Sequence, residues 1–187
     1  GPVAVRWAVY ELGQRWGIRY LVDSDVYPAR GEWSGLPDLD VIMEPNMRIR
    51  CWRLVNALPH GPVSWSWEEN RRFLRQIAKM KYNRIYCALW PLHPNVHYTF
   101  RGLAKPPGDL YFGLPFPIDE DTIAREKYPG MKQFTNPEFV GADSPEEVVR
   151  RGTELIQKIL SESRQLGLET SLWILPFSWP KEFMEVL

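Results

Sequence analysis

Tryptophan side chains occur near the ends of the apolar segments of this chain, where a ligand could reach them. Trp90 and Trp179 lie beside prolines at or just after predicted strands, and Trp173 lies within one. An indole ring can stack on the apolar face that the axial hydrogens of a sugar ring form. Packing in the protein core is the alternative. It is favoured for Trp173, whereas Trp90 and Trp179 are equally compatible with either role.

The first predicted long strand, residues 48–57, carries polar side chains that could bind hydroxyl or carboxylate groups. Arg50 and Arg53 are three residues apart, so they point to opposite faces and at most one faces a closed interior. Because an inward charge must be paired or face a ligand, we expect Arg50 either to clamp a ligand or to form an ion pair with a later strand. Asn56 and His60 follow the strand, where they could hydrogen-bond a sugar hydroxyl or cap the loop.

Two further groups of residues contain side chains that could form a metal or catalytic site, but the surrounding sequence argues against either role. His93 and His97 have the i, i+4 spacing that brings two imidazoles to one metal ion on a helix, but nearby prolines disfavour a helix. No metal or other cofactor is therefore predicted, and His93 is predicted to contact substrate instead. The acidic run at residues 119–121 is more typical of a solvated turn than of a catalytic carboxylate pair. No catalytic residue is assigned within this chain.

Two helix-strand units of similar pattern would position these side chains. Ser66 and Ser144 each precede a glutamate by three residues, which is the capping-box pattern at the start of a helix. Repeated helix-strand units imply a parallel sheet, and in such folds the binding and catalytic side chains gather at the carboxyl ends of the strands. The predicted helices and strands of the two units are, in chain order, residues 67–81, 84–90, 145–166 and 168–175.

The rest of the chain contains shorter predicted elements and two long connections. A helix is expected over residues 4–16, with Gly17 at its end, followed by a strand over residues 18–22. Residues 23–45 have the Asp, Pro, Gly and Ser content of a linker, which places a domain boundary near residue 45. Residues 91–143 are too long for a bare connection, so we expect this segment to be functional or partly structured.

The composition argues against several classes of partner and scaffold. Lys and Arg number 23, as do Asp and Glu, so no overall field attracts a nucleic acid or an anionic membrane. No apolar run is long enough to span a bilayer, and the chain does not begin with a signal-peptide pattern. Cys51 and Cys87 lack the C-x-x-C spacing, and they are predicted to be two buried, reduced thiols.

The predicted units are too few to close a barrel. Three strands with two crossover helices leave bare sheet edges, which would be a poor final structure. The chain begins with Gly1 and Pro2 instead of a methionine, and it ends within a further predicted helix, residues 181–187. We therefore expect this chain to be a fragment of a larger protein and the missing remainder of its own chain to be one of its partners.

Several segments of the chain carry a family resemblance. They are Trp7-Ala8-Val9-Tyr10-Glu11-Leu12 with residues 16–20, the run from Gln76 to Arg84, and residues 163–176. These segments resemble the junction between a small α/β domain and an eight-stranded β/α barrel in glycoside hydrolases of the β-N-acetylhexosaminidase and α-glucuronidase families. The run from Arg53 to Asn56 is more similar to the α-glucuronidases.

This resemblance implies an α/β fold of two parts. Residues 1–44 would be the C-terminal part of an accessory α/β domain and its linker. Residues 45–187 would be the first three strands or so of an incomplete (β/α)8 TIM-type barrel.

The resemblance also implies the hydrolysis of O-glycosyl bonds by the full-length protein. Its catalytic carboxylates would lie on later strands, so the fragment alone would be inactive. An oligosaccharide or glycoside is the expected partner, and a secreted or periplasmic location would suit a glycan hydrolase. The substrate-binding residues expected in this chain are Arg50, Asn56, His60, Trp90, His93 and Trp179. The alternative is a non-catalytic carbohydrate-binding or structural α/β module.

Overall fold

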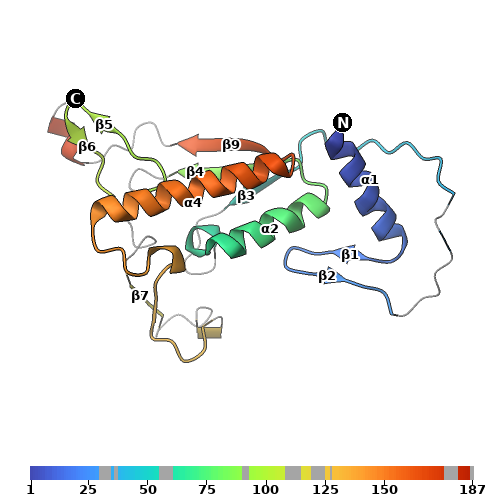
Figure 1. Cartoon of the computed structure of the whole chain (residues 1–187), viewed down its shortest axis with the longest axis horizontal. Helices are drawn as coiled ribbons and strands as arrows, with labels where there is room; N and C mark the ends of the chain where they lie inside the picture. The colour runs from blue at the N-terminus through green and yellow to red at the C-terminus, as the bar shows by residue number, and fades with distance from the viewer. Residues whose placement is uncertain are drawn as a thin grey trace.

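A three-stranded parallel sheet is the central element of the computed structural model (Figure 1). The structure describes residues 1–29, 35, 38–54, 61–89, 93–107, 115–118, 125–126, 128–174 and 181–185. In chain order, with η for a 3₁₀ helix, the elements are α1 Pro2–Arg15, β1 Arg19–Tyr20, β2 Asp25–Val26, β3 Cys51–Leu54, η1 Pro62–Ser64, α2 Trp67–Lys79, β4 Arg84–Leu89, β5 Thr99–Phe100, β6 Leu103–Ala104, β7 Phe116–Pro117, β8 Gln133–Phe134, η2 Pro137–Phe139, α4 Pro145–Gln165, β9 Glu169–Ile174 and η3 Lys181–Glu185.

The strands of the central sheet follow one another in space as they do in the chain. β4 pairs in parallel with β3 on one side and with β9 on the other, and Cys51, Arg84 and Glu169 align in one row. The predicted mixed α/β fold with a parallel sheet is therefore confirmed. β3 begins at Cys51 instead of residue 48, and β9 begins at Glu169 instead of residue 168, while the predicted ends of both strands lie outside the described residues. The helix predicted from residue 181 is the 3₁₀ helix η3.

Serine caps begin helices α2 and α4, but only one capping box is complete. The Ser66 hydroxyl accepts from the Glu69 N–H, and the Glu69 carboxylate accepts from the Ser66 N–H at 2.8 Å. Ser144 likewise accepts from the Glu147 N–H at 3.2 Å. The Glu147 carboxylate instead pairs with Arg150 at 2.7 Å, so the second predicted box is wrong in its reciprocal half.

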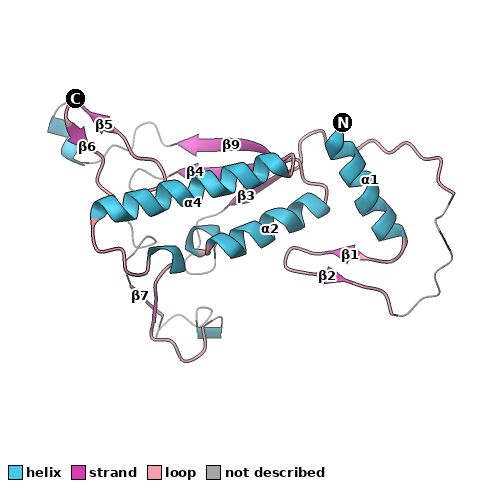
Figure 2. Cartoon of the chain, in the orientation of Figure 1, coloured by secondary structure: helices cyan, strands magenta, loops and turns pink. Residues whose placement is uncertain are grey.

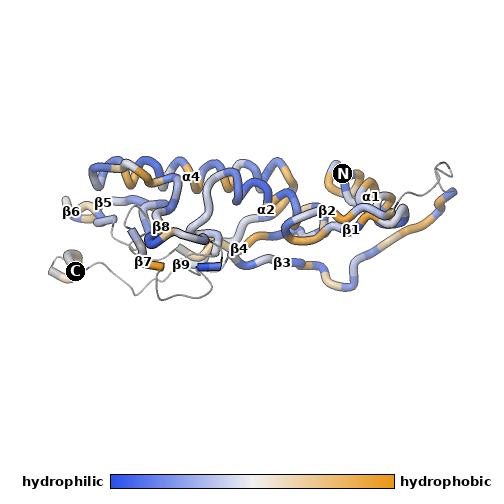
Figure 3. The backbone as a smooth tube through the Cα atoms, turned by 90° about the horizontal axis from the view of Figure 1, so that it is seen from below, coloured by the Kyte–Doolittle hydropathy of each residue, from blue (hydrophilic) through white to orange (hydrophobic). Residues whose placement is uncertain are grey.

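Helices α2 and α4 cover the same face of the sheet, as Figures 2 and 3 show from two directions. The side chains of Ile85 and Cys87 on β4 point to this face and are 0% and 4% exposed. The helices, β4 and neighbouring segments contribute one buried cluster: Phe73, Leu74, Ile77, Ile85, Cys87, Phe139, Leu155, Ile156, Ile159 and Leu168.

The opposite face of the sheet, called the open face below, is covered by no described helix. Because side chains alternate along a strand, it carries Arg84 and Tyr86 from β4 and the side chains aligned with them on β3 and β9. Cys51 is one of these and is exposed. The prediction of two buried thiols is thus wrong for Cys51 and right for Cys87, because the two cysteines face opposite sides of the sheet.

The long connection after β4 lies at the carboxyl edge of the sheet (Figure 1). Its described parts form the antiparallel pairs β5–β6 and β7–β8 and the helix η2, which confirms that the segment is partly structured. Gly152 of α4 allows this segment to pack closely against the helix, because a Cβ at this position would lie only 2.8 Å from the Pro94 ring.

Helix α1 and the β1–β2 pair lie beyond the opposite, amino edge of the sheet (Figure 1). Gly17 ends α1 with a φ of +91°, as expected of a C-terminal glycine. Asp25 was predicted to lie in a linker, but it pairs with Tyr20 in a hairpin and forms an ion pair with Lys79 of α2 at 2.6 Å. The predicted boundary near residue 45 thus separates two parts that contact each other.

Asn83 joins the amino ends of all three strands. Its side chain accepts from the Arg50 N–H at 2.7 Å and donates to the Arg48 carbonyl at 2.8 Å. Its backbone donates to the Arg50 carbonyl at 3.0 Å and accepts from the Glu169 N–H at 2.9 Å. The amide side chain therefore sets where β3 begins relative to β4.

We predict that Asn83→Ala lowers the free energy of unfolding by about 2 kcal/mol, because two backbone groups lose their side-chain partner. Asn83→Asp keeps the acceptor and loses the donor, so its loss should be smaller. Urea denaturation measures both, with Gln157→Ala on the exposed side of α4 as the control. A loss for Asn83→Ala within about 0.5 kcal/mol of the control would contradict this role.

Candidate functional site

An arginine and two aromatic rings from three different strands meet on the open face. The Arg53 guanidinium of β3 lies 5.8 Å from the ring centre of Tyr86 on β4 and 5.6 Å from that of Trp173 on β9. Arg53 and Tyr86 are aligned residues of neighbouring strands, and Trp173 lies two residues beyond the β9 residue aligned with Tyr86. We call these three residues the aromatic platform.

The aromatic platform combines apolar rings with an available cation. Arg53 is exposed, and it forms no hydrogen bond or ion pair with any residue that the structure describes. Indole and phenol rings accept the apolar face of a sugar, while a guanidinium donates to hydroxyl or carboxylate oxygens. Arg53 and Trp173 each lie one residue before the end of their strand, whereas Tyr86 is the third of the six residues of β4. The platform thus extends from the middle of the sheet toward the carboxyl ends, where parallel α/β folds bind their ligands.

At the amino end of the same face, the charged side chains are paired with each other. Arg84 and Glu169 are aligned on neighbouring strands, and Arg84 Nε donates to Glu169 Oε2 at 3.1 Å. Glu169 is the one carboxylate that the described strands of this sheet contribute. The described strands of this sheet therefore contain no pair of carboxyl groups of the kind that a glycosidase places across the scissile bond.

A buried lysine ties down the segment that follows β4. Lys105 Nζ donates to the backbone carbonyls of His93 and Val96, the latter at 2.7 Å. Lys105 is 4% exposed, and burial lowers the pKa of its ammonium group to about 8. The His93 side chain is itself 1% exposed, so this histidine belongs to the interior of the segment, and its contact with a sugar stays a prediction.

The other predicted site residues are divided between the two edges of the sheet or lie outside the described residues. Asn56, His60, Trp90 and Trp179 are outside the described residues, as is the acidic run at 119–121. His97 is exposed whereas His93 is buried, so the two imidazoles do not share one environment. Within the described ranges, no group of three or more His, Cys, Asp or Glu side chains could hold a metal ion.

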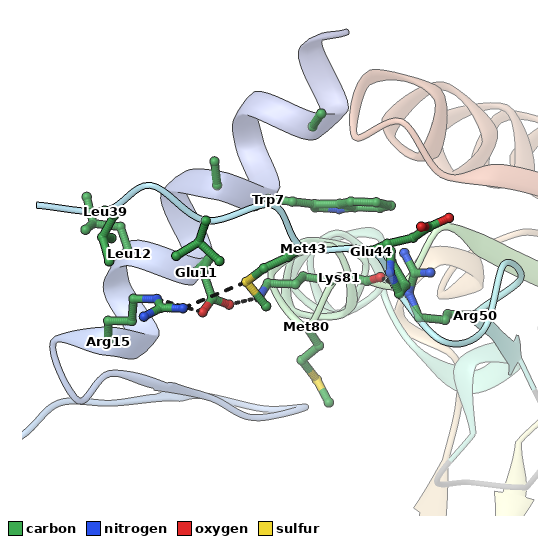
Figure 4. Close-up of a pocket in the computed structure, with 14 residues that line it drawn as sticks. Trp7, Glu11, Leu12, Arg15, Leu39, Met43, Glu44, Arg50, Met80 and Lys81 are labelled. Carbon is green, nitrogen blue, oxygen red and sulfur yellow. Dashed lines mark hydrogen bonds and ion pairs between the residues drawn. The ribbon is translucent and has the colours of Figure 1, made fainter.

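Arg50 lies at the amino edge, far from the aromatic platform. Its Nε and Nη1 donate to the carbonyls of Lys81 and Met47, each at 2.7 Å, and its guanidinium lies 4.7 Å from the ring centre of Trp7. The alternative of an ion pair with a later strand is wrong for the described part of the chain. Arg50 instead lines a pocket between α1 and residues 39–45 (Figure 4).

Within β3, the arginine on the open face is Arg53, whereas Arg50 lies just before the strand and its contact with a substrate stays a prediction. The available signal was the alternation along β3, where Trp52 packs on Phe73 of α2 with ring centres 5.5 Å apart. An inward Trp52 turns Arg53 to the other face. Local sequence could not show that Tyr86 and Trp173 lie beside Arg53, because their positions depend on the register of three strands.

No protein-family model matches the chain, and comparisons with curated proteins and with solved structures find no match. Among the described residues, no helix combines the length and the apolar character that a membrane crossing requires.

The buried Lys105 predicts a particular pH dependence of stability. Its pKa is lower in the folded protein than in the unfolded chain, so the folded state binds fewer protons between about pH 8 and 10.5. Stability contributed by this group must therefore rise with pH across that window, by at most about 3 kcal/mol. We expect the free energy of unfolding of the wild type, relative to Lys105→Met, to increase over this range.

Denaturation curves at several pH values measure this difference. Burial also raises the pKa of Cys87 and of Tyr128, each to about 12, but both groups remain in the variant and their effects cancel. Lys158→Met, which removes an exposed lysine of α4, is the control. If the wild type and Lys105→Met differ by the same amount at pH 8 and pH 10.5, the lysine is not buried as described.

Proposed function

We propose that this chain forms the first strands of a β/α barrel in a glycoside hydrolase, and that a sugar binds the aromatic platform on the open face. The order β3–β4–β9 supports this proposal, because successive strands of such a barrel are neighbours. Helices α2 and α4 cover one face only, as the outer ring of helices does in a barrel. The open face would then be part of the barrel interior.

The exposure of Leu172 also supports a sheet that continues. Leu172 is aligned with the buried Cys87, so it points to the helix-covered face, yet it is 49% exposed. In a β/α barrel a further helix would cover this position from the far side of β9. A half-exposed leucine on the covered face is the surface that such a helix would bury.

The aromatic platform is the observation that carries the proposal. Trp173 and Tyr86 offer rings for a pyranose, and Arg53 offers donors without a protein acceptor among the described residues. A guanidinium pairs with a carboxylate more strongly than with a hydroxyl. A glucuronic acid, the sugar that the resemblance to α-glucuronidases implies, therefore suits the platform better than the neutral N-acetylglucosamine.

The catalytic carboxylates are proposed to lie outside this chain, which makes binding the activity to measure. The same strands, with no carboxylate pair on the open face, would also suit a non-catalytic carbohydrate-binding module. Hydrolysis of aryl glucuronides or N-acetylglucosaminides by the longer protein would distinguish a hydrolase from this alternative. Neither possibility requires a metal or another cofactor.

We predict that the chain binds a xylo-oligosaccharide bearing glucuronic acid more tightly than a tetramer of N-acetylglucosamine, as measured by titration calorimetry. Trp173→Ala should weaken binding by about tenfold or more, the cost of losing roughly 1.4 kcal/mol of ring contact. Arg53→Gln should weaken binding of the acidic sugar selectively. Trp7→Ala, at the opposite edge of the sheet, is the control for loss of an indole.

Thermal unfolding of each variant establishes that the folded state persists. The proposal fails if neither sugar binds the folded chain. It also fails if Trp173→Ala binds as tightly as the Trp7→Ala control.

A further inference from the structure

The pocket at the amino edge has the build of a small-molecule site that is independent of the aromatic platform. It has a volume of about 560 Å3, within the range of natural ligand pockets, and lies between α1, residues 39–45 and the end of α2 (Figure 4). Nine of its lining residues are aliphatic or aromatic and carry no charge: Ala4, Trp7, Ala8, Leu12, Leu39, Val41, Met43, Pro45 and Met80.

The charged residues of this pocket leave one cation without a carboxylate. Glu11 pairs with Arg15 at 3.0 Å and also with Lys81. These hydrogen bonds, above all that from Lys81, keep the pKa of Glu11 below its usual value. Arg50 has no ion pair within the described part of the chain, and its buried Nη2 has no hydrogen-bond acceptor there. A buried donor without an acceptor is costly, and a ligand could supply the acceptor.

The arrangement of these groups matches an elongated ligand with one charged end. Trp7, Glu44 and Arg50 lie at one end of the pocket in Figure 4, while Leu12 and Leu39 lie toward the other, together with Arg15, whose charge is paired with Glu11. The lining carries three cationic side chains against two anionic ones, which favours an anion. Methionines such as Met43 and Met80 adapt to varied apolar shapes.

We propose that this pocket binds a small amphiphile whose carboxylate pairs with Arg50 and whose apolar body packs against Trp7, Leu12 and Met80. The ligand class is a medium-chain carboxylic acid or an aromatic acid of similar size. The site lies at the amino edge of the sheet, so it does not depend on sugar binding at the aromatic platform.

NMR signals of the methionine methyl groups can report ligand binding inside the pocket and elsewhere in the chain. The chain has five methionines, of which Met43 and Met80 line the pocket, while Met131 and Met184 lie in other segments. We expect decanoate, titrated into the methyl-labelled chain and followed by NMR, to shift the Met43 and Met80 signals saturably and to leave those of Met131 and Met184 in place. Decanamide, its uncharged analogue, should bind about tenfold more weakly, because it lacks the charge that Arg50 recognises.

Two neighbouring residues of α1 provide a matched pair of variants. Ala8 lines the pocket, whereas Val9 is outside it and 59% exposed. Ala8→Phe should fill the pocket and weaken decanoate binding by about tenfold or more, and Val9→Phe should leave it unchanged. Replacing Arg50 would also break its bonds to the Lys81 and Met47 carbonyls, so charge is tested instead with Glu44→Gln, which should tighten binding.

Three results would overturn the proposal. The first is equal binding of decanoate and decanamide, which would remove the role of Arg50. The second is equal affinity in Ala8→Phe and Val9→Phe. The third is a shift at Met131 and Met184 as large as that at Met43 and Met80, which would show general adsorption of the amphiphile.

Discussion

The burial of one sheet face under two helices determines where every side chain of the central strands points. Ile85 and Cys87 lie beneath α2 and α4, so the alternation of a strand places Arg84 and Tyr86 on the opposite face. The parallel register extends this choice to β3 and β9, which brings Arg53 and Trp173 beside Tyr86. The proposed sugar platform is therefore a consequence of how the hydrophobic core is packed.

The turn between α2 and β4 joins this core to the amino-terminal part of the chain. Lys81 has a φ of +63°, a left-handed conformation that costs a residue with a side chain about 1–2 kcal/mol. Its ammonium group donates to Glu11 and to Gln14, the latter at 2.8 Å, and its carbonyl accepts from Arg50. These bonds offset the backbone strain. They also hold α1 against the end of α2, where the proposed amphiphile pocket is formed.

The sequence predicted best those features that depend on neighbours in the chain. The Ser66 capping box, the end of α1 at Gly17 and the helix-strand order follow from local patterns, and the structure confirms them. Pairing between distant residues was harder. Asp25 lies among linker-like residues but pairs with Tyr20 and contacts Lys79, which no local pattern indicates.

In the candidate site, too, local sequence patterns predicted less than the contacts between distant residues determine. Alternation predicted that Arg50 and Arg53 point to opposite faces of one strand, but β3 begins at Cys51, after Arg50. The packing of Trp52 on Phe73 places Arg53 on the open face. The contacts of Arg50 with Lys81 and Trp7 come from residues far along the chain in both directions. Their meeting is a result of tertiary structure, so it could not be derived from spacing within one strand.

The sheet has one covered and one open face, and its two cysteines test this arrangement most directly. Cys51 is on the open face and exposed, whereas Cys87 is buried beneath the helices. Alkylation of the folded chain, followed residue by residue by mass spectrometry, should modify Cys51 readily and Cys87 only as fast as the protein opens. Equal protection of both thiols, or equal reactivity of both, would contradict the account.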